Sequence, residues 1–130
     1  MAKERIGSNA IFSGPQKGLT TIDKHCYAYS GRVTVTTSAT TLLDFNTGKG
    51  YILADIQPTY FTADTGENVF YEIYINGSEI YASEIGSTTA TTPYQDIRIL
   101  IPPLSRFEVK GYAASADRIL GVTLTGKVYK

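Results

Sequence analysis

The sequence predicts an all-β fold, namely a single-domain antiparallel β-sandwich of jelly-roll type with about eight strands. The clearest observation is Asn76-Gly77, which interrupts the alternating apolar and polar residues of Val69 to Ile85. A two-residue type I′ turn needs positive φ at both central residues, so this dipeptide predicts a β-hairpin. Strand-like runs recur along the rest of the chain at the spacing typical of sandwiches, and no window shows helical spacing.

The first predicted strands follow one another from Cys26 onward. Cys26 to Thr37 alternates apolar and polar residues, and Gly31 marks a bulge or bend within it. Thr40 to Phe45 is a short strand that ends at a cluster of turn-forming residues. Tyr51 to Thr62 is a long strand, and Pro58 has no N–H to donate to a ladder. The half of this strand around Pro58 is therefore expected at an edge or a bulge.

Three further strands complete the predicted fold after the hairpin. They span Tyr94 to Ile101, which Pro102-Pro103 ends, then Arg106 to Ala114 and Arg118 to Tyr129. The alternation along all the strands predicts which apolar side chains face the core. They are Val33, Val35, Val69, Tyr71, Ile73, Ile75, Ile97, Ile99, Ile101, Leu120, Val122, Leu124 and Val128.

Size and composition limit the classes of partner. The 130 residues suffice for one domain with its own core. The 12 basic and 12 acidic residues give zero formal net charge without a basic patch, which argues against nucleic acid or an anionic membrane as partner. The single Cys26 excludes an intrachain disulfide and fits assembly in a reducing cytoplasm. The N-terminus lacks the apolar core of a signal peptide, and no apolar run approaches the roughly 20 residues of a transmembrane helix.

Residues 1–25 differ from the domain formed by residues 26–130, because their apolar residues follow neither strand nor helix periodicity. A disordered tail is one interpretation, since termini are often loose. The other is an extended N-terminal arm that orders against a neighbouring subunit. Ile11-Phe12, just before Gly14-Pro15, would then anchor the arm.

The hairpin also predicts an interface. Its second face carries Phe70 and Tyr74, whereas the last strand keeps its second face polar with Thr123, Thr125 and Lys127. An aromatic second face on a sandwich indicates cover by a partner or by the arm. The candidate interface residues are Ile11, Phe12, Phe70, Tyr74 and Tyr94.

Catalytic and metal motifs are weak in this chain, and no enzyme activity or cofactor is predicted. Asp64-Thr65-Gly66 matches the catalytic triplet of retroviral-type aspartic proteases, but no apolar strand precedes it and Glu67 replaces the expected small residue. The same triplet also suits an ordinary β-turn. His25-Cys26 lacks the further His or Cys ligands of a zinc site, and neighbouring residues of a strand point to opposite faces.

Two other sequence features give only weak signals of a binding or modification site. Calcium binding would require loops that bring together the scattered acidic residues Asp44, Asp55, Asp64 and Glu67. Asn76-Gly77-Ser78 matches the N-glycosylation sequon. The hairpin turn itself requires Asn-Gly, so the turn explains this match.

Four segments carry a resemblance to a family. HCYAYSGRV (25–33), YEIYINGSEIY (71–81), ILIPPLSRFEV (99–109) and TLTGKVY (123–129), taken in order, resemble small jelly-roll virion proteins of tailed bacteriophages that decorate or cement the capsid. ILIPPLSRFEV also resembles trimeric jelly rolls of the tumour-necrosis-factor and C1q type, which are commonly secreted. The phage resemblance implies a structural capsid protein without catalytic residues.

The resemblance implies a decoration or cement subunit that stabilises the shell by binding across capsid-protein boundaries. Its expected partners are the major capsid protein of the same virion and further copies of itself, as a homotrimer, and its expected location is the capsid surface after synthesis in the host cytoplasm. The alternative is a glycan- or host-receptor-binding module of a virion. That module would use a shallow aromatic surface between the loops Thr62 to Asn68 and Gly86 to Tyr94.

Overall fold

The computed structural model describes residues 18–62, 67–86 and 96–130. Within these ranges the chain forms ten strands and no helix. The strands are β1 (Thr20–Ile22), β2 (His25–Tyr29), β3 (Val33–Val35), β4 (Thr40–Asn46), β5 (Tyr51–Tyr60), β6 (Val69–Ile75), β7 (Ser78–Ile85), β8 (Ile97–Ile101), β9 (Arg106–Ala113) and β10 (Arg118–Tyr129).

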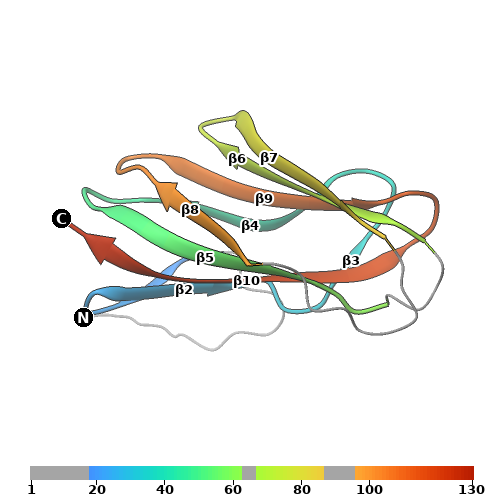
Figure 1. The fold of residues 1–130 in the computed structure, drawn as a ribbon, viewed down its shortest axis with the longest axis horizontal. Coiled ribbons are helices and arrows are strands. Elements are labelled where there is room, and N and C mark those ends of the chain that lie inside the picture. Colours follow the sequence, from blue (N-terminus) through green and yellow to red (C-terminus); the bar gives the residue numbers. More distant parts are fainter. Residues whose placement is uncertain (1–17, 63–66, 87–95) are drawn as a thin grey trace.

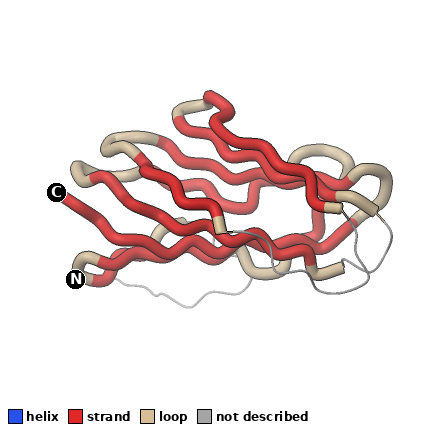
Figure 2. The backbone as a smooth tube through the Cα atoms, in the orientation of Figure 1, coloured by secondary structure: helices blue, strands red, loops and turns tan. Residues whose placement is uncertain are grey.

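The strands form two antiparallel sheets that lie face to face (Figures 1 and 2). The six-stranded sheet has the order β1-β2-β10-β5-β8, and β3 also pairs with β10. The four-stranded sheet has the order β4-β9-β6-β7. The predicted all-β sandwich is therefore confirmed.

Four antiparallel pairs are nested along the chain. β6 pairs with β7 at the hairpin, β5 with β8 around it, β4 with β9 around these, and β2 with β10 at the outside. The pairs alternate between the two sheets. The pairing of β10 with β5 and of β9 with β6 joins the nested pairs into continuous sheets.

The turn at Asn76-Gly77 has the predicted geometry. Its φ angles are 52° at Asn76 and 82° at Gly77, and Ile75 lies opposite Ser78. The Asn76 side chain is also used structurally, because its Oδ1 accepts a hydrogen bond from the backbone N–H of Arg106 at 2.9 Å. Asn76 and Gly77 of the sequon thus both have a structural role, the first in the turn and in a hydrogen bond to β9, the second in the turn.

The structure differs from the prediction at the N-terminal strands. Thr20–Ile22, within the predicted arm of residues 1–25, forms β1 against β2. Gly31 has a φ of 70° and separates β2 from β3, so the run predicted as one strand becomes two that both pair with β10. Strands of three residues are too short to show a period of two, which is why the sequence pattern did not separate them.

Among the described residues, the β5–β8 ladder runs from Ile52 to Ile56, and Pro58 pairs with Val122 of β10. This agrees with the expected position of Pro58 at an edge, because its missing N–H removes no hydrogen bond from that ladder.

The predicted core residues face the space between the sheets. Most are buried, and Val33, Ile75, Ile97, Ile99 and Val128 are partly buried against the same core. The sequence pattern left out Cys26, Ala28, Leu42, Leu43, Phe45, Ile52, Ala54, Ile56, Tyr60, Ile85, Phe107, Val109 and Ala113, which are buried with them. One core thus joins both sheets.

Gly126 sets the separation of β10 and β5. A Cβ atom at this position would lie 2.6 Å from the backbone oxygen of Leu53 and 3.1 Å from the Cα of Ala54. Backbone atoms cannot move aside as a flexible side chain can, so we expect Gly126→Ala to lower the free energy of unfolding by about 1–3 kcal/mol. Urea denaturation measures this change.

Gly48→Ala is the matched control, because nothing lies within 4 Å of the added Cβ. We expect its unfolding midpoint to stay near that of the wild type. Equal midpoints for Gly126→Ala and Gly48→Ala would show that the close approach does not constrain the sheet.

Candidate functional site

The outer face of the six-stranded sheet exposes a group of large apolar side chains. They come from the strands β1, β2, β5, β8 and β10, and we call them the apolar face: Ile22, Tyr29, Tyr51, Leu53, Leu100 and Tyr129. Ile22 is 62 % exposed and Leu100 54 % exposed. Six of the ten large hydrophobic residues exposed in the described part of the chain therefore lie on one sheet surface.

The register places these side chains in rows across the sheet. Ile22 lies opposite His25, His25 opposite Lys127, Lys127 opposite Leu53, and Leu53 opposite Leu100. Directly opposite residues of antiparallel strands share a face, so these side chains line one row. At one end of the face the rings of Tyr51 and Tyr129 stack with centroids 5.2 Å apart.

Polar groups lie among the apolar ones. The Arg98 Nε donates a hydrogen bond to the Asp55 Oδ1 at 3.0 Å, and Thr125 lies opposite Asp55 on the neighbouring strand. The rings of Tyr27 and Tyr29 stack at 4.8 Å on β2. Mixed aromatic, aliphatic and paired polar groups on a flat sheet are typical of protein–protein interfaces.

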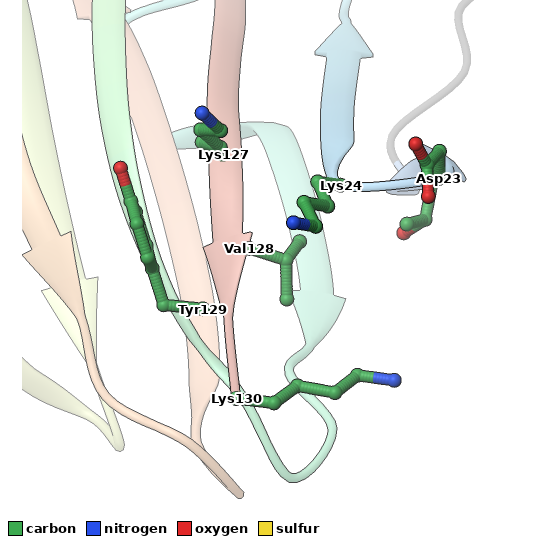
Figure 3. Close-up of a pocket in the computed structure, with 7 residues that line it drawn as sticks. Asp23, Lys24, Lys127, Val128, Tyr129 and Lys130 are labelled. Carbon is green, nitrogen blue, oxygen red and sulfur yellow. The ribbon is translucent and has the colours of Figure 1, made fainter.

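Two hollows border this surface. One, of about 350 Å³, is lined by His25, Leu53, Asp55, Arg98, Thr125, Gly126 and Lys127. The other, of about 510 Å³, lies at the end of β10 and is lined by Thr21, Asp23, Lys24, Lys127, Val128, Tyr129 and Lys130. Figure 3 shows that the lysine side chains of the second hollow point in different directions. They do not converge on one anion-sized centre.

The opposite outer face, on the four-stranded sheet, is covered by its own side chains. The ring of Phe70 stacks on Tyr112 at 4.7 Å, and the Lys110 ammonium lies 4.9 Å from the centroid of Tyr74. The Tyr74 hydroxyl donates to Glu72 Oε1 at 2.8 Å, and this bond to a carboxylate raises the pKa of Tyr74 to about 12. Phe70 and Tyr74 are half-buried by these contacts, and an interface there stays a prediction.

A buried ion pair joins the segment before β6 to the start of β10. The Arg118 Nη2 lies 2.6 Å from the Glu67 Oε2, and the Glu67 side chain is buried. The Glu67 Oε1 accepts hydrogen bonds from the Ser115 hydroxyl, from its backbone N–H and from the Ala116 N–H, the last at 2.8 Å. The Ser115 hydroxyl, the two backbone N–H groups and the Arg118 charge outweigh desolvation and lower the pKa of Glu67.

The structure separates the residues weighed for metal binding. His25 is exposed, whereas Cys26 faces the core, and burial raises the pKa of the Cys26 thiol. Asp44 forms an ion pair with Arg106 and Asp55 with Arg98, on different sheets. No group of three or more His, Cys, Asp or Glu side chains is placed to hold a metal in the described ranges.

Several predicted site residues lie outside the described residues. They are Ile11, Phe12, Asp64, Thr65, Gly66 and Tyr94. Most of the two loops assigned to glycan or receptor binding lies outside as well. The protease and glycan-binding hypotheses therefore have no geometry to support them.

Sequence reasoning missed the apolar face. Its signal was the presence of apolar residues on both sides of two strands, in Tyr51-Ile52-Leu53 of β5 and Ile99-Leu100-Ile101 of β8. A strand with one face in water keeps that face polar, so consecutive apolar residues mark a strand covered on both sides. This signal is as strong as that of Phe70 and Tyr74.

The Glu67 cluster makes stability depend on pH. Because folding lowers the pKa of Glu67, its carboxylate stabilises the fold above its unfolded pKa of about 4.3, and that stabilisation is lost as pH falls through the lower folded pKa. We expect Glu67→Gln to lower the melting temperature at pH 7, and the gap to wild type to narrow toward pH 3. Thermal unfolding monitored by circular dichroism measures both.

The exposed Glu79 offers a control, since Glu79→Gln removes a carboxylate without disturbing a buried pair. Its melting temperature is expected to follow the wild type across the same pH range. A Glu67→Gln gap that stays constant from pH 7 to pH 3 would contradict the role of the ionised carboxylate.

The described residues contain no helix with the length and apolar character needed to cross a membrane. The surface features are thus two sheet faces of different character, one exposed and apolar and one closed by its own contacts. No family model, curated protein or solved structure matches the chain.

Proposed function

We propose that the protein is a virion structural protein, a capsid decoration or cement subunit that stabilises the shell by binding across capsid-protein boundaries. The apolar face carries this proposal. Large apolar side chains gathered on one surface mark sites of protein association, because burying each removes apolar area from water. The resemblance of four segments to small phage virion proteins indicates the kind of partner.

The character of the face supports a protein surface as its ligand. Leu53 and Leu100 lie side by side on β5 and the edge strand β8, and burying a Leu side chain fully contributes about 1.5–3 kcal/mol. The Asp55–Arg98 pair beside them is already formed, whereas Lys127, opposite Leu53 on β10, needs an acidic group of the partner when docking buries it. Exposed apolar side chains around the polar outward residues of β10 make a mixed surface, which suits a protein shell better than a highly charged polymer.

The strand pairing supports the finer fold assignment, the jelly roll. A jelly roll arises when a long antiparallel ribbon of eight strands folds on itself, so that the first strand pairs with the last and the middle two form a hairpin. The pairs β2–β10, β4–β9, β5–β8 and β6–β7 follow this order. Jelly rolls occur in viral capsid proteins and in lectins, so the fold is compatible with the proposal and does not establish it.

Self-association completes the proposed function. A decoration subunit acts at shell positions of local symmetry, and a homotrimer repeats one heterologous contact around a threefold axis. The N-terminal arm predicted as residues 1–25, of which Thr20–Ile22 forms β1, would reach neighbours that the domain does not touch. Several weak contacts made together then give strong overall binding.

Binding to empty shells tests the proposal. Shells assembled from the major capsid protein of the same virus, without this protein, are mixed with the full chain and sedimented. We expect the wild type to co-sediment. The double variant Leu53→Glu, Leu100→Glu is expected to bind at least about tenfold more weakly, because two apolar side chains that docking buries are replaced by charged ones. Quantification of the pelleted protein measures the difference.

Leu104→Glu is the control, since Leu104 is exposed outside the apolar face and undergoes the same change of chemistry. This variant is expected to sediment like the wild type, and all variants are first matched in melting temperature. A wild-type protein that stays in the supernatant at every concentration would overturn the capsid proposal. Equal losses for the Leu104 and the double variant would overturn the assignment of the face.

A further inference from the structure

Within ranges 18–62, 67–86 and 96–130, β7 ends the four-stranded sheet, and its open edge differs from the other sheet edges. β1 has three residues, and β8 has five and is followed by Pro102-Pro103. β4 has one exposed residue, Asn46, among its seven. β7 has eight residues, and the first five, Ser78 to Ala82, are exposed. β7 is long, exposed and free of proline, and its protection against pairing with another chain consists of a bulge at Ile80 and the charged residues Glu79 and Glu84.

The edge has a bulge and then a regular stretch. Ile73 lies opposite Tyr81 and Tyr74 opposite Glu79, so Ile80 has no residue across from it. From Tyr81 to Ile85 the pairing with β6 continues without interruption. Five residues span about 17 Å, enough for one further strand to pair along the open side. Ile80 and Tyr81 are 46 % and 37 % exposed, so the edge also offers apolar contact.

The edge is acidic. Glu79 and Glu84 lie on β7, and Glu72 lies opposite Ala82 on β6. Lys110, opposite Glu72 on β9, is the basic residue beside them. A strand that adds here is therefore favoured when it carries positive charge.

The chain itself contains a segment of matching chemistry. Residues 1–17 include Lys3, Arg5 and Lys17 against the single acidic Glu4, so their side chains carry a net charge of +2. The first proline is Pro15, so the residues before it can donate backbone N–H groups to a ladder. Ile6, Ile11 and Phe12 provide apolar side chains to meet Ile80 and Tyr81.

We propose that residues 1–17 of a second copy add as a strand to the Ile80–Ile85 edge of β7. The N-terminal segment joins the domain at β1, an edge strand of the six-stranded sheet. β7 is an edge strand of the other sheet and lies at the top of Figure 1, whereas β2, the partner of β1, lies at the bottom. A segment reaching its own β7 would spend much of its length of at most about 56 Å crossing the domain. The same segment can reach the β7 edge of a neighbouring copy without crossing its own domain.

Arm exchange of this kind is a heterologous contact, because the arm of one copy meets the edge of the next. Three such contacts that close into a ring give a trimer, which links this inference to the arm and trimer in the proposed function. Docking on the shell uses a different surface, the apolar face. Failure of arm exchange therefore leaves shell binding intact, and the two proposals fail in separate experiments.

Charge reversal with rescue tests arm exchange in the full chain. Light scattering coupled to gel filtration is expected to give the wild type the mass of an oligomer, a whole-number multiple of the 14.2 kDa chain that is above the mass of one chain. Glu79→Lys with Glu84→Lys is expected to weaken association about tenfold, since attraction becomes repulsion at two exposed sites. Adding Lys3→Glu and Arg5→Glu to that variant restores opposite charges and is expected to restore the mass.

Hydrogen exchange at high and low protein concentration gives the second readout. Amides of residues 81–85 and of residues 5–12 are expected to become protected together as concentration rises. A wild-type chain that remains at 14.2 kDa at all concentrations overturns the proposal, whether or not these amides are protected. So does an oligomer whose mass is unchanged by the β7 reversal, or a reversal that the second pair of changes does not rescue.

Discussion

The central position of β10 is the constraint on which the rest of the structure depends. β10 pairs with β2 and β3 along one side and with β5 along the other, so its backbone polar groups are satisfied on both edges. Its inward residues Leu120, Val122 and Leu124 form the floor of the core. The close approach at Gly126 keeps β5 near enough for the ladder to run its full length.

The two outer faces differ because the side chains of one sheet contact one another, whereas those of the other sheet leave apolar area exposed. On the four-stranded sheet, aromatic rings lie against each other or against lysine, and Asp44, Arg106 and Glu108 form ion pairs. That surface is closed within the chain. On the six-stranded sheet Tyr27 stacks on Tyr29 and Tyr51 on Tyr129, and Leu53 and Leu100 stay exposed on β5 and the edge strand β8. The outer face of the six-stranded sheet therefore gains more by covering apolar area than the outer face of the four-stranded sheet.

The sequence predicted the elements whose pattern is local. Asn76-Gly77 determines its turn through the φ angles of two residues, and the alternation in β6, β8 and β10 identifies the core side of each strand. These signals depend on neighbours in sequence. The strands β8, β9 and β10 were predicted along the chain for the same reason, although their places within the two sheets were not.

The remaining features depend on residues distant in sequence. β1 and β3 are three-residue strands that exist because β2 and β10 offer open edges, and the Glu67–Arg118 pair joins segments 51 positions apart. The contrast between the two outer faces also escaped prediction. Phe70 and Tyr74 looked uncovered in the sequence because the cover supplied by Tyr112 and Lys110 comes from another strand.

The nesting of strand pairs has a consequence for synthesis. β2 leaves the ribosome early, but its neighbour β10 is about 90 residues further along the chain, with Tyr29 opposite Thr123. At roughly 5–20 residues per second, β2 waits about 5–20 seconds for the strand that completes its sheet. The β6–β7 hairpin closes within microseconds once made, whereas the outermost pair forms last. During synthesis the inner pairs are thus complete before the outer ones, and a chain cut short before β10 lacks the central strand of its larger sheet.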